Sequence, residues 1–165
     1  MKRLFLLFAV LVLLASCTHM SELPLSFRTE LIAEAENYTG IPYEWGGQSF
    51  WWEDDPYVDC SGFVINVYES VLERHGRHLL FDDTTAYALW DEYTLPVEDP
   101  LPGDLIFFTD GVSDEVAHVA IFIREEDGVL FFIDASSLPD TMKVMERSYP
   151  ADNAKIHSFA RMIYK

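Results

Sequence analysis

Helical periodicity in this chain is confined to its first half, and short apolar runs occupy its second half. Apolar residues recur at helical spacing over 26–38 and 60–75, and a third helix is expected over 84–93. The apolar runs that follow are bounded by turn residues and predict strands, at 101–109, 117–125, 129–137 and 155–165. Helices followed by antiparallel strands are typical of an α+β fold.

The composition is that of one folded domain that does not bind nucleic acid. The 165 residues are 50% hydrophobic and 15% aromatic, which is enough to bury a core, and no internal repeat or second domain is visible. The formal net charge of -17 disfavours nucleic acid and anionic lipid headgroups, because both are bound through clustered Lys and Arg. An acidic surface can attract substrates that carry free amines, although solubility alone also explains it.

The N-terminus has the pattern of an export signal that ends at a lipidated cysteine. Two basic residues precede an apolar run over 4–14 that is too short to cross a bilayer as a permanent helix. Small residues then lead into Cys17, an arrangement that resembles the lipobox of bacterial lipoproteins. We therefore expect residues 1–16 to be removed as a signal peptide and Cys17 to be acylated, with 17–25 as a short tether. An ordinary signal peptide with an accidental cysteine is the alternative.

Cys60 is a candidate nucleophile. Acylation of Cys17 leaves Cys60 without a disulfide partner in an exported protein, where an unneeded thiol is exposed to oxidation. Cys60 also begins the predicted helix 60–75, and the partial positive charge of a helix N-terminus stabilises a thiolate. The spacing of the two cysteines is not that of a zinc site, and no metal or other cofactor is expected.

His118 and Asp134 are the candidate partners of that thiol. A cysteine hydrolase needs a histidine to hold the thiolate and to protonate the leaving amine, and a third polar group to orient the histidine. His118 opens an apolar strand, whereas His157 in the last strand is a weaker rival. If two strands pair around a turn at 125–128, position 118 falls near 134 or 135, and Asp134 comes within reach of His118.

The succession YEWGG, DCSGFV, PGDLIFF, HVAIFI and IDAS resembles the NlpC family of bacterial cell-wall peptidases, from about residue 26 to the C-terminus. The resemblance implies a papain-like domain over 26–165, in which N-terminal helices pack on a small antiparallel sheet and the catalytic cysteine lies at a helix N-terminus. It assigns the nucleophile to Cys60, the base to His118 and the third polar residue to Asp134. Three further residues match positions near the thiol or in the substrate site: Tyr43, whose hydroxyl supports the oxyanion together with backbone amides, Asp59 and Ser61.

Two features depart from that family pattern. Many relatives have histidine as the third residue, but the aspartate at position 134 can still accept a hydrogen bond from the imidazole and stabilise its cation. The stretch between Gly47 and Asp59 is also longer than usual and contains Trp51 followed by a second tryptophan and three acidic residues. This loop, 51–55, either forms one wall of the cleft, where its carboxylates meet a substrate amine, or covers an edge of the core.

The resulting hypothesis is an exported, lipid-anchored endopeptidase of the cell envelope that cuts peptidoglycan stem peptides. In the family, the usual bond joins the side chain of D-glutamate to a diamino acid. Thr18 follows the acylated cysteine in place of the aspartate that often retains lipoproteins in the inner membrane, which favours the outer membrane where an organism has one. Two alternatives stay open: an amidase or other acyl-transfer hydrolase with the same triad, and a catalytically idle lipoprotein that binds wall peptides.

Overall fold

The structure is a computed structural model that describes residues 23–165. The predicted signal peptide, 1–16, and the predicted acylation site, Cys17, lie outside the described residues, as does the predicted tether up to residue 22. Within the described part, no helix is both long enough and apolar enough to cross a membrane.

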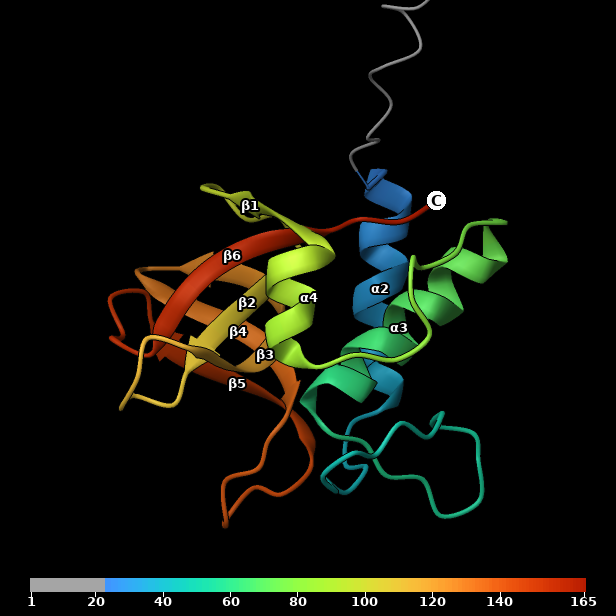
Figure 1. Cartoon of the computed structure of the whole chain (residues 1–165), viewed down its shortest axis with the longest axis horizontal. Coiled ribbons are helices and arrows are strands. Elements are labelled where there is room, and N and C mark those ends of the chain that lie inside the picture. The colour runs from blue at the N-terminus through green and yellow to red at the C-terminus, as the bar shows by residue number, and fades with distance from the viewer. Residues whose placement is uncertain (1–22) are drawn as a thin grey trace, which may run out of the picture.

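Three helices form where the sequence predicts them (Figure 1): α2 over Leu25–Asn37, α3 over Cys60–Arg74 and α4 over Ala86–Glu92. The side chain of Asp59 caps α3 by accepting a hydrogen bond from the Gly62 N–H. Most residues of α3 are buried, because α2 packs against one side of this helix and the sheet against another.

One antiparallel sheet holds six strands in the order β1-β6-β2-β3-β4-β5. The apolar runs predict β2, β3, β4 and β6, and the predicted α+β, papain-like class is confirmed. These runs do not predict β1 and β5, the two edge strands, in which only the first residue of each is buried, so neither strand needs an apolar run. The strands are β1 (Thr94–Val97), β2 (Leu105–Thr109), β3 (Val116–Glu126), β4 (Val129–Ala135), β5 (Val144–Pro150) and β6 (Ile156–Met162).

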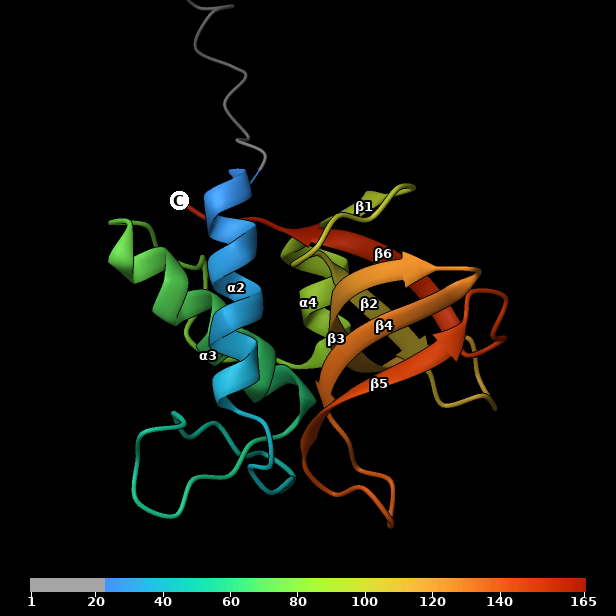
Figure 2. The ribbon, with the colours of Figure 1, turned by 180° about the vertical axis from the view of Figure 1, so that it is seen from behind.

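The sheet is apolar on both faces, and each face has its own core. Successive side chains of a strand point to opposite faces of the sheet, so neighbouring residues of β2 lie in different cores. Phe107 lies in the large cluster that includes the helices, whereas Phe108 lies in a smaller cluster with Ala120, Phe122 and Phe132. Figures 1 and 2 show α2 and α3 gathered at one side of the sheet.

Two loops meet near the N-terminal end of α3. One loop, 38–59, precedes that helix, and the other, 136–143, joins β4 to β5. The Tyr43 N–H donates to the Met142 carbonyl across the two loops (3.1 Å). Both loops lie at the lower end of the molecule in Figures 1 and 2, whereas α2 begins at the upper end. The loops that flank the start of α3 are therefore remote from the first described residues.

A buried ion cluster joins three elements of the fold. Asp104, directly before β2, is fully buried and accepts hydrogen bonds from Arg28 of α2 (Nη1 to Oδ1, 2.9 Å) and from Arg161 of β6 (Nε to Oδ1, 3.0 Å; Nη2 to Oδ2, 2.9 Å). The Pro-Gly-Asp turn of the sequence thereby holds α2 and β6 against the start of β2.

Candidate active site

Cys60 is held at the first turn of α3 by hydrogen bonds to its neighbours. The Oδ1 of Asp59 accepts the Gly62 N–H (2.8 Å) and the Ser61 hydroxyl (3.0 Å), and its Oδ2 accepts the Gly46 N–H (3.0 Å). Cys60 carries a free, half-buried thiol. At this position the peptide dipoles of the helix favour a thiolate.

Gly47 and Gly62 allow the loop before α3 to approach the helix closely. A Cβ atom on Gly62 would lie 2.1 Å from the carbonyl oxygen of Gly47. The same carbonyl accepts the Asp59 N–H at 2.8 Å. The glycine pair of YEWGG and the glycine of DCSG therefore fit against one another, and their contact fixes the loop against the turn that carries Cys60.

His118 and Asp134 meet across the β3–β4 hairpin, with 2.6 Å between Nε2 and Oδ2. Ile121 pairs with Ile133 in this hairpin. The same register places position 136 opposite His118, so Asp134 lies two residues away along β4 and the contact between the two side chains is diagonal. The predicted register is therefore wrong by one or two residues, because the hairpin turns tightly between Glu126 and Val129, later in the chain than the prediction assumes; the irregularity between Phe122 and Arg124 recovers one residue of that difference. The two side chains still share a face and come into contact.

Arg147 of β5 completes a buried network around Asp134. Its Nε donates to Asp134 Oδ1 at 2.9 Å, and its Nη2 donates to Oδ2. Asp134 itself is fully buried. Burial by itself raises the pKa of this carboxyl, but the hydrogen bonds from His118 and Arg147 outweigh it and hold the pKa below its ordinary value. Asp134 is therefore a carboxylate despite its burial.

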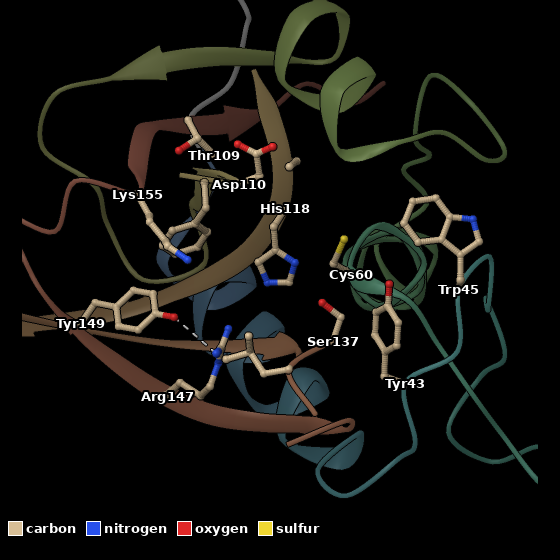
Figure 3. Close-up of a pocket in the computed structure, with 13 residues that line it drawn as sticks. Tyr43, Trp45, Cys60, Thr109, Asp110, His118, Ser137, Arg147, Tyr149 and Lys155 are labelled. Atoms are coloured by element: carbon tan, nitrogen blue, oxygen red, sulfur yellow. Dashed lines mark hydrogen bonds between the residues drawn. The ribbon is translucent and has the colours of Figure 1, made fainter. Parts of the chain in front are cut away.

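Cys60 lies beside the same imidazole ring (Figure 3). Because Nε2 faces Asp134, Nδ1 is the ring nitrogen available to the thiol. Burial by itself lowers the pKa of His118, but the hydrogen bonds to Asp134 and Cys60 and the charges of both partners raise it from 6.5 to about 9. His118 is therefore protonated at neutral pH.

Tyr43 and Trp45 border the site next to Cys60 (Figure 3). Burial, followed by the charges of Cys60 and Asp59, raises the pKa of Tyr43 to about 12. The Tyr43 hydroxyl therefore keeps its proton at neutral pH and remains a hydrogen-bond donor. The indole of Trp45 is 87% exposed, so it is free to contact a bound molecule.

A pocket of about 280 Å³ is lined by Cys60, His118, Tyr43 and Trp45. Tyr43 and Trp45 lie to one side of His118 and Cys60, and Lys155 and Tyr149 lie to the other (Figure 3). Other side chains of the lining are Phe108, Thr109, Asp110, Ser137, Leu138 and Arg147.

Asp59 and Ser61 do not line this pocket. They lie in a neighbouring pocket of about 210 Å³ that contains Thr84 and Thr85, and Trp45 lines both pockets. The structure thus brings Cys60 and Tyr43 into one pocket with His118, and it places Asp59 and Ser61 in the next.

The loop over 51–55 lies against α2 and α3, with its residues exposed to solvent. The indole nitrogen of Trp51 donates to Glu34 Oε1 of α2 (2.9 Å), and Trp52 stacks on Phe50 beside α3. No residue of 51–55 is among those that line the pocket of Cys60. The contacts therefore agree with the packing alternative for this loop and not with a wall of that pocket.

The sequence prediction missed Arg147 and Lys155. Arg147 belongs to β5, in which half-buried positions 145, 147 and 149 alternate with exposed ones; that period of two is the signal that could have revealed the strand. The rival His157 is bonded to its neighbour Ser158 (Nδ1 to Oγ, 2.9 Å) and does not line the pocket. Within residues 23–165, no cluster of three or more His, Cys, Asp or Glu side chains could hold a metal ion.

The motifs of this site and the fold around it match a known family. The model of the NlpC/P60 family matches residues 40–158. The chain belongs to the NlpC/P60 family. Its predicted class as a cysteine peptidase of this family is therefore confirmed, and the family includes endopeptidases of peptidoglycan.

Several members of the NlpC/P60 family are similar over much of this chain. The probable endopeptidase NlpC of Escherichia coli K12 is 30% identical over 149 residues, which cover 86% of this chain and 88% of that protein. The γ-DL-glutamyl hydrolase of Bacillus subtilis 168 is 27% identical over 68% of this chain and 24% of its own length. The probable peptidoglycan endopeptidase LytE of the same organism is 30% identical over 73% of this chain and 31% of its own length.

A solved structure agrees with the fold. The crystal structure of a protein similar to lipoprotein, of the NLP/P60 family, from Staphylococcus aureus superposes with a TM-score of 0.59 and 26% identity. The match covers 90% of this chain and 46% of that one, so this chain spans less than half of the crystallised relative.

Proposed function

We propose that this chain is an endopeptidase that hydrolyses the amide between D-glutamate and a diamino acid in peptidoglycan stem peptides. In this proposal Cys60 is the nucleophile, His118 the acid and base, and Asp134 the residue that orients His118. The observation that carries the proposal is the environment of His118, whose ring is bonded to a buried carboxylate and lies beside a cysteine at a helix N-terminus. A thiol hydrolase requires this arrangement.

The relatives support the substrate class. Two are named as endopeptidases, one of them of peptidoglycan, and a third is named as a γ-DL-glutamyl hydrolase. A bond from the γ-carboxyl of a glutamyl residue is also the bond that the sequence resemblance implies.

In the first half of the reaction, the Cys60 thiolate attacks the scissile carbonyl carbon, and the carbonyl oxygen takes up the negative charge. Backbone N–H groups of the first turn of α3 and the protonated Tyr43 hydroxyl are suited to stabilise that oxygen. As the C–N bond breaks, its electron pair stays on nitrogen, which takes the proton from Nδ1 of His118. The amine leaves, and the acyl group remains as a thioester on Cys60.

In the second half, the neutral His118 accepts a proton from the water that attacks the thioester. Release of the new carboxylic acid returns the thiolate and the protonated imidazole. Asp134 exchanges no proton; it accepts the hydrogen bond of Nε2 and stabilises the cationic ring. The raised pKa of His118 means that the resting site already holds the proton that the leaving amine needs.

We further propose that the mature protein is exported and anchored by a lipid on Cys17. The sequence pattern of residues 1–17 supports this, as does the similarity to an NLP/P60 relative described as similar to lipoprotein. The first turn of α2 and the loops around Cys60 lie at opposite ends of the molecule, so an anchor before α2 leaves the pocket clear of the membrane (Figure 1). The intact mass of the mature chain tests the lipid.

The test of the activity is product analysis with a matched variant. The full chain is incubated with purified stem peptides, and the fragments are identified by mass spectrometry. We expect wild type to release the diamino acid portion from the D-glutamyl portion and Cys60→Ala to release nothing, since the proposed thioester forms on the Cys60 thiol. Equal far-ultraviolet circular dichroism of both proteins controls for folding.

Other outcomes contradict defined parts of the proposal. A fragment from a different amide bond, such as an amidase would produce, would support the thiol chemistry and contradict the proposed bond. The same fragments from Cys60→Ala would reject Cys60. No fragment with either protein would reject peptidoglycan hydrolysis in favour of a binding role.

A further inference from the structure

The pocket continues past His118, on the side away from Tyr43 and Trp45. Under the proposed function, His118 hands its proton to the leaving amine, so the departing residue must lie next to the imidazole. The acyl portion then lies toward Cys60 and Trp45. The side chains beyond His118, including Lys155 and Tyr149, therefore face the residue that leaves.

Lys155 is held in a defined place directly before β6. Its carbonyl accepts the Thr109 N–H (2.9 Å), and its own N–H donates to Asn153 Oδ1 (2.9 Å). Its alkyl stem lies over Gly111, where a Cβ atom would come within 3.2 Å of the Lys155 Cε. Gly111 also has a φ of +82°, so two constraints favour glycine here and keep the path of the lysine open. Figure 3 shows the ammonium group turned toward the pocket.

The charge of Lys155 is uncommitted, unlike that of its neighbour Arg147. Arg147 is bonded to Asp134 through two nitrogens. None of the ion pairs among residues 23–165 involves Lys155. The nearby Asp110 uses its Oδ1 to accept two backbone N–H groups of its own loop. An ammonium group that lines the pocket without an ion-pair partner among residues 23–165 is suited to bind an anion there, against the overall negative charge of the protein.

Tyr149 supplies a second polar group on the same side. Its oxygen accepts a hydrogen bond from Arg147 Nη1 (3.5 Å), which leaves its own O–H able to donate. A hydroxyl donor and an ammonium group on one wall match the two oxygens of a carboxylate.

We propose that Lys155 binds a carboxylate of the residue that leaves as the amine, and so selects stem peptides whose diamino acid carries a free carboxylate. This inference rests on the proposed function and names the part of the substrate that this side of the pocket recognises. A diamino acid such as diaminopimelate offers two such groups, the α-carboxylate and the carboxylate at its distal end, and both present the same chemistry.

Three synthetic stem peptides separate the two sources. One contains γ-D-glutamyl-diaminopimelate with both carboxylates free, the second has the α-carboxylate amidated, and the third has the distal carboxylate amidated. Each is cleaved by the full-length wild type, by Lys155→Met, by Lys155→Arg and by Lys143→Met. Lys143→Met is the matched control, because it removes the same charge from an exposed position outside the pocket.

We expect Lys155→Met to lower kcat/KM about 10-fold for the peptide with both carboxylates free, the size of one lost hydrogen bond to a charged group. The peptide that lacks the bound carboxylate should be cleaved equally by both proteins, and which peptide this is identifies the carboxylate. Lys155→Arg should restore the preference, and Lys143→Met should match wild type.

Two results would overturn the inference while leaving the proposed function intact. In the first, wild type cleaves all three peptides with the same kcat/KM. In the second, Lys155→Met lowers kcat/KM by the same factor for all three peptides. Failure of wild type to cleave any of them would instead reject the proposed function. The two failures are therefore distinguishable in one set of reactions.

Discussion

Asp134 is the residue that we propose orients His118, at a position where the sequence resemblance implies histidine in many relatives, and its surroundings are suited to a carboxylate. It is fully buried, which disfavours its charge, but Arg147 and His118 both donate to it. Arg147 thus supplies the positive charge that keeps Asp134 ionised. The carboxylate in turn raises the pKa of His118 and directs Nδ1 toward Cys60.

Asp134→Asn tests whether the charge of Asp134 keeps His118 protonated. The amide retains a hydrogen-bond acceptor but loses the charge that stabilises the imidazolium. We expect the pKa of His118 to fall well below 9, and kcat at neutral pH to fall about 100-fold, which is less than the loss in His118→Ala. The pH–rate profile and the imidazole resonances by NMR measure the two effects.

The pH dependence of the stability of Asp134→Asn tests whether Asp134 raises the pKa of His118 in the folded protein. A folded-state pKa of His118 above its unfolded value means that the protonated ring stabilises the fold below about pH 6.5, and that this contribution is lost as pH rises through about 9. The free energy of unfolding should therefore differ more between wild type and Asp134→Asn at pH 6 than at pH 10. A constant difference would show that Asp134 acts on stability without His118.

At the scale of elements, the sequence predicts well the helices and strands whose own apolar residues form a regular pattern. α3 has a stripe of apolar residues and an acidic cap, and the β3–β4 hairpin has two apolar runs around an acidic-glycine turn. The contact of His118 with Asp134 is predictable for that reason. Its register is not, because the acidic-glycine stretch does not reveal that the chain turns tightly between Glu126 and Val129, nor that the pairing shifts again between Phe122 and Arg124.

Gly62→Ala tests how tightly the loop is set against α3. Alanine in a helix normally stabilises relative to glycine by about 1 kcal/mol. Here its Cβ would lie 2.1 Å from the Gly47 carbonyl oxygen, so the helix and loop must separate. We expect the opposite sign, a loss of about 1 to 3 kcal/mol in urea unfolding, together with slower alkylation of Cys60.

Ser70→Ala in the same helix is the matched control. The Ser70 hydroxyl is buried without a hydrogen-bond partner in the described structure, so its removal should not destabilise the protein. If Gly62→Ala were as stable as wild type, the close approach of Gly47 would not be what positions Cys60.

At the scale of the whole molecule, the pocket gathers residues from segments that the sequence separates widely. Cys60 and His118 carry motif signals, but Arg147 and Lys155 reach the site only because β5 lies beside β4 and β6 lies beside β2. Strand order is a property of the assembled sheet and of edge strands with weak apolar patterns. Sequence reasoning therefore finds the proposed reacting groups and misses the residues around them.

Asp104 shows the same dependence on assembly, because it joins α2, β2 and β6. Its carboxylate is fully buried and is bonded to Arg28 and Arg161, so its neutralisation leaves two guanidinium groups without their shared counter-charge. Removing one partner of a buried ion pair costs about 3 to 5 kcal/mol. We expect Asp104→Asn to lose that amount in the free energy of unfolding, measured by urea titration at neutral pH.

The control for Asp104→Asn is Glu126→Gln, which breaks the exposed pair of Glu126 with Arg124 (Nε to Oε2, 3.6 Å). Exposed pairs contribute between 0 and about 1 kcal/mol, since water and salt screen them. Both variants replace a carboxylate by its amide, so the expected difference between them comes from the burial of Asp104 and from its two arginine partners. If Asp104→Asn cost no more than Glu126→Gln, the three elements would be held together by apolar contacts, and the Pro-Gly-Asp turn would not need its acid.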